Sequence, residues 1–293
     1  MISESAHVKN KKITEENRKY YEDSGFLIAD ALLTLDEIAE IRQEAVEIFK
    51  GKRGEIEGIV KMDDDTSDFE VLKNYIAIHF PHKISSKITE YVLHPIIAEI
   101  LTKIIGPNVK CMQSMLFVKG PGKPGQSWHQ DEYYIPTRDR SLTGVWIAVD
   151  DAEIENGCLW VIPGSHKDMP INRRIPYIGD QYGDVDTCDL SPYTENDALA
   201  VEVKRGSVVF FNGYLFHSSL RNRSGNRFRT ALVSHYMSAA SMLPWNWDGR
   251  LELKEDMRDI IMVAGQDPYA YKGIQYLTYP FLRPEVVNIV KDM

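Results

Sequence analysis

A histidine and an aspartate stand two residues apart in the stretch Gln126 to Tyr134, "QSWHQDEYY", as His129 and Asp131. Imidazole and carboxylate groups are common ligands of protein-bound metal ions. The pair alone is a weak signal, because a chain with eight histidines and 43 acidic residues will contain such a pair by chance. A solvated pair or an ordinary hydrogen bond is the alternative interpretation.

The position of the pair and a distant third residue strengthen the metal hypothesis. On a strand, side chains two apart share one face, so we expect His129 and Asp131 to point together and Gln130 to point away. A third ligand is expected from His217, which ends the apolar run "VVFFNGYLFH". Two imidazoles and one carboxylate leave open metal positions, as in non-haem Fe(II) oxygenases, whereas a closed zinc site needs a fourth protein ligand.

An arginine follows the second histidine on the next predicted strand. Arg229 lies twelve residues after His217, and we expect its strand to be antiparallel to that of His217 and next to it. Its guanidinium could hold a carboxylate bidentately near the metal, with Ser219 as a hydroxyl partner. This pattern indicates an anionic, metal-chelating cosubstrate. The alternative is a solvated basic hairpin made of the arginines in "RNRSGNRFR".

The elements that must position these residues divide into helices followed by strands. Thr14 and Thr34 begin predicted helices that end near Tyr21 and Gly51, and a third helix is expected over about 87–105. After Pro107, short β-branched and aromatic runs alternate with turn residues. We therefore expect a mainly β fold with flanking α-helices, a sandwich or barrel.

Two later segments lack such regular patterns. The stretch 168–196 is rich in proline, glycine, aspartate and tyrosine and is too long for an ordinary turn. Loops of that length often bind ligands, so we expect it to close over a substrate. The region after residue 242 is aromatic but shows no periodicity that predicts its structure.

Composition excludes several classes of function. The chain has 293 residues, 43% hydrophobic residues and a formal net charge of -9, so it can fill a core but is a poor candidate for binding nucleic acid. Three cysteines do not make a disulfide framework. No signal-peptide pattern or membrane-spanning apolar run is visible. We expect a soluble cytoplasmic protein with a small-molecule partner, whose oligomeric state the sequence does not reveal.

In combination, these motifs resemble the phytanoyl-CoA dioxygenase family of Fe(II)- and 2-oxoglutarate-dependent oxygenases. The resemblance runs through "YYEDSGFLIADALLT", "IIGPNVKCMQSMLFVKGPG", "WHQDEYYIPTRDRSLTGVWIAVDDAEIENGCLWVIPGSHK" and "GSVVFFNGYLFHSSLRNRSGNRFRTALVSHY", to about Met242. It implies a double-stranded β-helix, a cupin-like jelly roll. We expect one oxygenase domain over 1–293, with a helical part over about 12–106, a jelly-roll core over about 107–242 and a C-terminal extension over 243–293.

The resemblance also implies roles for particular residues. His129, Asp131 and His217 match the iron ligands, and Arg229 matches the anchor of the distal carboxylate of 2-oxoglutarate. Because Arg229 is one residue further from His217 than is usual in the family, Arg227 is a fallback. Residues matching the lining of the cosubstrate site are Ser219, Trp146, Met115 and Gln113. Residues that could face the substrate are Tyr133, Tyr134 and Arg138, although core packing and solvated charge are at least as plausible for them. His235 is expected to be a satisfied core histidine.

The implied activity is that of a dioxygenase using Fe(II), 2-oxoglutarate and O2. It would hydroxylate an unactivated carbon of a small molecule and release succinate and CO2. Asp131 favours this outcome over halogenation, because related halogenases lack that carboxylate. Two alternatives remain: a cupin-like isomerase or lyase, and a non-catalytic binding module. The substrate is open between a CoA thioester, a polar metabolite and a natural-product intermediate, with a basic mouth for an anion expected from Arg138, Arg140, Arg173 and Arg174.

Overall fold

Two β-sheets form the centre of the computed structural model, which describes residues 2–60, 62–167, 171–246 and 256–283. The larger sheet contains, in order, β1 (His7–Val8), β2 (Phe26–Ala29), β11 (Val208–Asn212), β6 (Thr143–Ala148), β13 (Arg229–Ser238), β4 (Val109–Lys119), β3 (Ala77–His79) and β15 (Phe281–Leu282), and β14 (Ile261–Ala264) also pairs with β4. The smaller sheet contains β10 (Leu199–Val201), β7 (Leu159–Val161), β12 (His217–Ser219) and β5 (Gln126–His129). A hairpin of β8 (Arg174–Pro176) and β9 (Asp186–Cys188) stands apart from both.

The two sheets share a hydrophobic core. Phe26, Trp146 and Val209 from the larger sheet belong to the same buried cluster as Leu159 and Val161 from the smaller one. Side chains on alternate positions of each strand therefore meet between the sheets, which is the arrangement of a jelly roll. The predicted fold class, mainly β with flanking α-helices, is confirmed.

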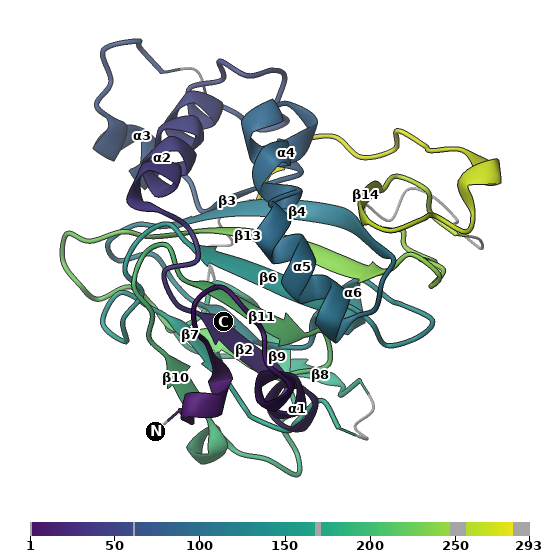
Figure 1. Cartoon of the computed structure of the whole chain (residues 1–293). Coiled ribbons are helices and arrows are strands. Elements are labelled where there is room, and N and C mark those ends of the chain that lie inside the picture. Colours follow the sequence, from purple (N-terminus) through teal and green to yellow (C-terminus); the bar gives the residue numbers. More distant parts are fainter. Residues whose placement is uncertain (1, 61, 168–170, 247–255, 284–293) are drawn as a thin grey trace.

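Helices cover the outer face of the larger sheet. They are α1 (Glu15–Ser24), α2 (Leu35–Phe49), α3 (Asp68–Lys73), α4 (Ser86–Val92) and α5 (Pro95–Ile104), with the short α6 (Asp131–Tyr134) near β5. Figure 1 shows α2, α4 and α5 lying over β3, β4 and β13. Ile41 of α2, Ile88 of α4 and Leu101 of α5 share one buried cluster with Leu116 and Leu232 of that sheet. This packing supports β4 and β13 from the outer face of the sheet.

The first two predicted helices are confirmed, and the third is wrong in one respect. Thr14 and Thr34 each form a capping box at the start of their helix. The segment predicted as one helix over 87–105 is two helices, α4 and α5, separated at His94 and Pro95. Proline lacks a backbone N–H and disfavours helical geometry in the preceding residue. The apolar periodicity therefore continues across a break that Pro95 imposes.

Described residues after position 242 pack against the larger sheet. Trp245, Met257 and Ile260 are buried in one cluster with Phe80 and Met112. These residues therefore extend the core, although they show no recognisable sequence pattern.

A buried ion-pair network also anchors that region. Arg258, which is 2% exposed, forms ion pairs with Asp256 and Asp267, and its Nε donates to the carbonyl of Gly273 at 3.2 Å. The arginine thus joins three points of the C-terminal region.

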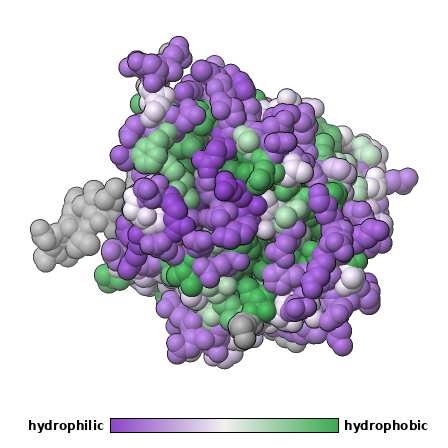
Figure 2. Space-filling model, turned by 60° about the vertical axis from the view of Figure 1, so that its left-hand side comes forward, coloured by the Kyte–Doolittle hydropathy of each residue, from purple (hydrophilic) through white to green (hydrophobic). Residues whose placement is uncertain are grey.

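The outer surface is mainly polar. Figure 2 shows hydrophilic residues over most of one face, with hydrophobic residues among them in patches. Among the described residues, no helix has the length and apolar character needed to cross a membrane. All three cysteines are buried and unpaired, as their sequence spacing predicts.

Replacing Arg258 tests how firmly the C-terminal region is held. We expect Arg258→Met to lower the free energy of unfolding by about 3 kcal/mol or more, because it leaves two buried carboxylates without their cation. Chemical denaturation followed by circular dichroism would measure the change. Lys204→Met is the matched control, since Lys204 pairs with Asp151 and Glu153 on the surface. An equal loss of stability in the two variants would contradict this prediction.

Candidate metal centre

His129, Asp131 and His217 come together inside the jelly roll. One ligand atom from each lies within 4.8 Å of the others, and all three residues are buried. The Asp131 Oδ1 atom is 3.6 Å from His129 Nε2 and 3.5 Å from His217 Nε2. His217 of β12 is also the register partner of His129 of β5. His217 lies 88 positions after His129 in the sequence. Strand pairing therefore brings the two distant histidines together.

Asp131 reaches the site in a different way from that predicted. The strand β5 ends at His129, and Asp131 is the first residue of α6 rather than the next inward position of a strand. Gln130 between them remains extended, with φ -121° and ψ 127°. Its side chain points elsewhere, as predicted, because its amide donates to the carbonyl of Tyr214 at 2.9 Å.

Backbone carbonyls fix how the two imidazoles are presented. His129 Nδ1 lies 2.7 Å from the carbonyl of Ser127, and His217 Nδ1 lies 2.9 Å from that of Leu215. A carbonyl only accepts, so each Nδ1 carries a proton, and each Nε2 is directed toward Asp131 and is the atom that can ligate a metal. Metal-binding histidines are typically oriented by such hydrogen bonds. The Gln126 amide, 3.0 Å from His129 Nε2, must turn away when a metal binds.

A third histidine contacts the carboxylate of Asp131. His235 Nε2 lies 3.0 Å from Asp131 Oδ2, so one carboxylate oxygen faces His129 and His217 and the other is held by His235. Burial opposes the charge of Asp131, but His217 and His235 outweigh it and hold the pKa of this carboxyl well below its usual range. His235 is thus a buried, hydrogen-bonded histidine, as predicted, and its contact also orients Asp131, which the sequence did not indicate.

The pKa values of the two predicted ligand histidines are shifted in opposite directions. Burial lowers the pKa of His129 well below its usual range, and the neighbouring His217 lowers it further. Burial also acts on His217, but the charge of Asp131 outweighs it and raises the pKa of His217. A neutral His129 is ready to ligate at neutral pH, whereas a metal ion must replace the proton that Asp131 favours on His217.

Arg229 is a buried cation near this cluster. It is 4% exposed, its Nε donates to the carbonyl of Gly157 at 3.0 Å, and its guanidinium lies 5.6 Å from the ring centroid of Trp146. Burial lowers its pKa to about 10, so it stays charged at neutral pH. Among the described residues, no carboxylate lies within ion-pair distance of it. A buried charge without a partner indicates a binding site for an anion.

The strand of Arg229 differs from the prediction in its neighbours. It belongs to β13, which pairs with β4 and β6 of the larger sheet, whereas His217 lies in the smaller sheet. The arginine therefore faces the metal cluster across the jelly roll rather than from an adjacent strand. The fallback Arg227 lies at the surface and pairs with Glu153 and Glu155 at 2.5 Å each, so it does not take this place.

A pocket connects the metal cluster with Arg229. Its lining includes three of the residues predicted to surround the cosubstrate, namely Ser219, Trp146 and Met115. Gln113 lies instead in a larger adjoining cavity, where its amide donates to His79 Nδ1 at 3.3 Å. Phe211, Leu159 and Val233 supply apolar walls to the pocket, and these walls limit the access of water to it.

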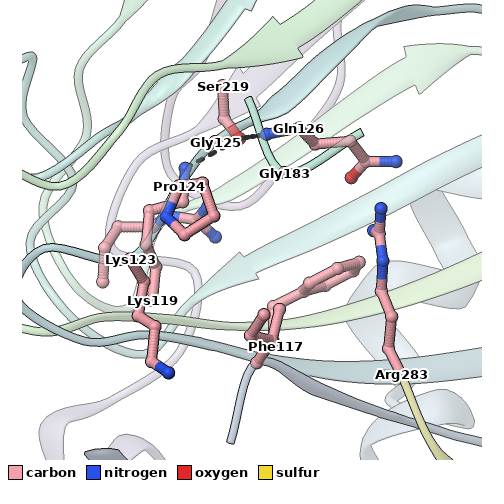
Figure 3. A pocket seen from close by; sticks show the side chains of 11 residues that line it. Phe117, Lys119, Lys123, Pro124, Gly125, Gln126, Gly183, Ser219 and Arg283 are labelled. Carbon is pink, nitrogen blue, oxygen red and sulfur yellow. Dashed lines mark hydrogen bonds between the residues drawn. The ribbon is translucent and has the colours of Figure 1, made fainter. Parts of the chain in front are cut away.

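Lys119 is a second buried cation that sequence reasoning missed. It is the register partner of Arg229, and its Nζ donates to Ser219 Oγ at 2.8 Å and to the carbonyls of Leu220 and Gly157 at 2.7 and 3.3 Å. Figure 3 shows the pocket that Lys119 and Ser219 line, with Arg283 reaching toward Gln126 from its other side. The available signal for Lys119 was its place at the end of a strand that pairs with the strand of the predicted anion-binding arginine.

Gly157 allows both cations to approach the same carbonyl. Its φ of +82° is in the left-handed region, and an added Cβ would meet the carbonyl oxygen of Leu220 at 2.3 Å and Lys119 at 3.0 Å. A residue with a side chain would therefore be strained and obstructed at this position.

A larger cavity of about 510 Å³ adjoins the cluster and includes His129 and Asp131 in its lining. Tyr133 and Tyr134 line it, as predicted for substrate-facing residues. Arg138 does not line it; this residue is exposed and its backbone N–H donates to Ser241 Oγ at 3.0 Å. The C-terminal region contributes four described residues to the lining, Trp245, Asn246, Phe281 and Arg283.

The segment 168–196, described from residue 171 onward, is tied to the metal strand. Arg174 donates to the carbonyl of Trp128 at 2.8 Å, and Asp184 accepts from the backbone N–H of Ser127 at 2.7 Å. Asp184 also lines the large cavity. The segment therefore supports β5 as well as bordering the cavity, so it is not a separable lid.

The ligand set fits a non-haem ferrous ion. Two imidazole nitrogens and one carboxylate oxygen on one side of a site, with a cavity opposite, suit a metal that must also bind a cosubstrate. The uncompensated Arg229 fits the far carboxylate of a metal-chelating dianion.

Comparison with known proteins agrees with this geometry. The model of the phytanoyl-CoA dioxygenase family matches residues 21–231. A phytanoyl-CoA dioxygenase of Arabidopsis thaliana is 37% identical over 150 residues, which is 50% of this chain and about half, 51%, of that protein. The peroxisomal phytanoyl-CoA dioxygenase of Mus musculus is 31% identical over 244 residues, covering 78% of this chain and 70% of that protein.

Solved structures with a similar fold include 2-oxoglutarate-dependent enzymes. The carbocyclase SnoK from nogalamycin biosynthesis aligns with a TM-score of 0.67 and 24% identity, covering 87% of this chain and 98% of that chain. EvdO2 from Micromonospora carbonacea, complexed with 2-oxoglutarate, aligns with a TM-score of 0.60 and 21% identity, covering 79% of this chain and 93% of that chain. Because the family match runs through the three predicted metal ligands and Arg229, this chain belongs to the phytanoyl-CoA dioxygenase family and is an Fe(II)- and 2-oxoglutarate-dependent dioxygenase.

Proposed function

We propose that the protein hydroxylates an unactivated carbon of a small-molecule substrate and releases succinate and CO2. The observation that carries this proposal is the cavity of about 510 Å³ that adjoins His129 and Asp131. A substrate there would lie beside the metal, on the side that the three protein ligands leave open. When bound, Fe(II), 2-oxoglutarate and dioxygen supply the oxidation itself.

The protein's own residues would bind and orient the reactants. His129, Asp131 and His217 would hold the metal, and Arg229 would bind the distal carboxylate of 2-oxoglutarate bidentately. His235 would keep one oxygen of Asp131 occupied, so that the other oxygen serves as a single metal ligand. The apolar walls around the pocket would exclude water from the reacting groups.

Ser219 is oriented to donate a hydrogen bond to that carboxylate. Its Oγ accepts from Lys119 Nζ at 2.8 Å and from the backbone N–H of Gln126 at 3.2 Å, and Figure 3 marks hydrogen bonds to it with dashed lines. With both lone pairs engaged, its own O–H is left to donate, and no acceptor for it occurs among the described residues. The pocket beside Arg229 is where such an acceptor would bind.

Lys119 would be stabilised by the same anion. Three oxygens surround its Nζ, which matches the three N–H groups of an ammonium ion. Burial lowers the pKa of Lys119 well below its usual value, and the nearby Arg229 lowers it further. A carboxylate bound on Arg229 would offset that repulsion.

A different oxidative outcome is the second candidate. Structural neighbours include the carbocyclase SnoK and the epimerase SnoN, which share the fold with this chain at 24% and 18% identity. Ring closure or epimerisation is therefore the alternative outcome that we consider for this chain. A cytoplasmic location remains a prediction from the sequence, because the mammalian relatives are peroxisomal enzymes.

Anaerobic reconstitution tests the assignment directly. We expect Fe(II) and 2-oxoglutarate together to give a visible absorption band, and admission of air to produce succinate. The band should be absent in His217→Ala, which lacks a metal ligand, and retained in His7→Ala, whose histidine pairs with Asp30 at the surface. No band in the unaltered protein would favour a cupin-like isomerase or lyase, or a binding module. A band with succinate but without oxygen insertion into any substrate would favour the second candidate.

Lys119→Met tests the role of the second cation. We expect the dissociation constant for 2-oxoglutarate to rise about tenfold, because Ser219 loses the group that orients its hydroxyl and the pocket loses a positive charge. Titration of the anaerobic absorption band would measure it. Lys110→Met is the control, since Lys110 is a buried lysine of the same strand that donates to the carbonyl of Ser241, away from the pocket. Equal 2-oxoglutarate affinity in all three proteins would rule out this role.

A further inference from the structure

We propose that the large cavity takes an uncharged, ring-containing molecule with hydroxyl or carbonyl oxygens, and not the polyanionic portion of a CoA thioester. This inference rests on the proposed function, since the cavity is treated as the substrate site of the dioxygenase. It is carried by three features of the described lining: its charge, its aromatic side chains and its free hydrogen-bonding groups.

Among the described residues of the lining, there is no unpaired lysine or arginine that could bind a phosphate group. Among the described residues, Arg283 is the only lysine or arginine that lines the cavity. Its Nη2 pairs with Asp184 Oδ1 at 2.6 Å. The pair is itself anchored, because Asp184 Oδ2 accepts from the backbone N–H of Ser127 at 2.7 Å. Asp131, the other charged residue of the lining, is committed to the metal. Recognition of phosphates normally requires free arginine or lysine side chains.

The arginines expected to form a basic mouth are also engaged. Arg173 pairs with Asp189 at 3.2 Å, and Arg174 pairs with Asp186 at 2.5 Å. Arg140 lies over the ring of Tyr214, 4.5 Å from its centroid. Arg138 is exposed outside the lining. Two of the four arginines of the predicted basic entrance are therefore paired with carboxylates, and none of the four lines the cavity.

Two groups of aromatic side chains line the cavity. Tyr133 and Tyr134 of α6 form an edge-to-face pair with centroids 5.0 Å apart and remain 50% and 46% exposed. The other group is centred on Phe80, whose ring lies 6.2 Å from Trp245 and 6.1 Å from Phe281. The second group is largely buried, with Phe80 0% and Trp245 6% exposed, so the accessible rings are those of Tyr133 and Tyr134. Accessible rings beside the candidate metal ligands favour a substrate with rings that can pack against them.

A neutral polar pair lies among these rings. Gln113 Nε2 lies 3.3 Å from His79 Nδ1, and an amide nitrogen can only donate, so the His79 proton resides on Nε2. Burial lowers the pKa of His79 to about 3, which keeps the imidazole uncharged. The pair thus presents one N–H donor and one amide carbonyl, and neither has another partner among the described residues. Such a pair selects hydroxyl or carbonyl groups and gains nothing from a full charge.

Two matched probes separate the neutral from the anionic class. Calorimetric titration of the protein loaded with Mn(II) and 2-oxoglutarate would compare estradiol, a neutral polycyclic phenol, with its 3-sulfate. We expect estradiol to bind at least tenfold more tightly. Palmitoyl-CoA, the third probe, should neither bind at comparable concentration nor displace estradiol. Tighter binding of either anion, or no binding of estradiol, would overturn the proposal.

Two variants connect the preference to the residues that carry it. Gln113→Leu should weaken estradiol binding about tenfold, whereas Gln43→Leu on the outer face of α2 should not change it. Asp184→Asn should free Arg283 and strengthen binding of the 3-sulfate, a gain that misfolding cannot produce. An unchanged preference in Asp184→Asn would count against the charge argument. Absence of the Fe(II) and 2-oxoglutarate absorption band in the unaltered protein would instead contradict the proposed function. Estradiol binding to the metal-free protein would still test the proposed preference of the cavity.

Discussion

The carboxylate of Asp131 is buried among three imidazoles, and the rest of the site depends on how its charge is balanced. Burying a lone carboxylate is costly, so the group needs cations or hydrogen-bond donors close by. His235 occupies one of its oxygens at 3.0 Å, and the other faces His129 and His217. A divalent metal between those ligands would supply the positive charge that the cluster is built to receive. Folding thus creates a site whose electrostatics favour one small cation.

Positive charge without a neutralising carboxylate lies on the other side of the same pocket. Arg229 and Lys119 are buried next to each other, and both donate to the carbonyl of Gly157. No carboxylate among the described residues neutralises them. The metal end of the pocket is thus suited to chelating oxygens, and the far end to a carboxylate. A dianionic 2-oxo acid satisfies both ends at once, which explains why the two sheets carry the two halves of the site.

Local sequence patterns predicted the parts of this arrangement that depend on neighbours in the chain. Capping boxes at Thr14 and Thr34 identified two helices, and the spacing of His129 and Asp131 with the distant His217 indicated the ligands. Features that depend on strand order were less accessible. The prediction that Arg229 lies beside the strand of His217 was wrong, because β13 pairs with β4 and β6, an order that no local pattern encodes.

Tertiary contacts explain the other features that the sequence did not predict. The contact of the core residue His235 with Asp131 was not predicted, because nothing in the sequence relates it to a residue 104 positions earlier. Lys119 became significant through its register with Arg229 on a neighbouring strand. The C-terminal region had no periodicity, since Trp245 and Phe281 are positioned by packing on Phe80 and not by a regular helix of their own.

The central claim is that one pocket binds a metal and a carboxylate-bearing cosubstrate together. The most direct measurement is the affinity for 2-oxoglutarate with and without Mn(II), a metal that binds such sites but does not carry out the oxidation. Linkage requires that each ligand strengthen the other if they touch. The account predicts at least tenfold tighter 2-oxoglutarate binding when Mn(II) is present. Equal affinity in the two conditions would show that the metal and the anion occupy separate sites, and would contradict it.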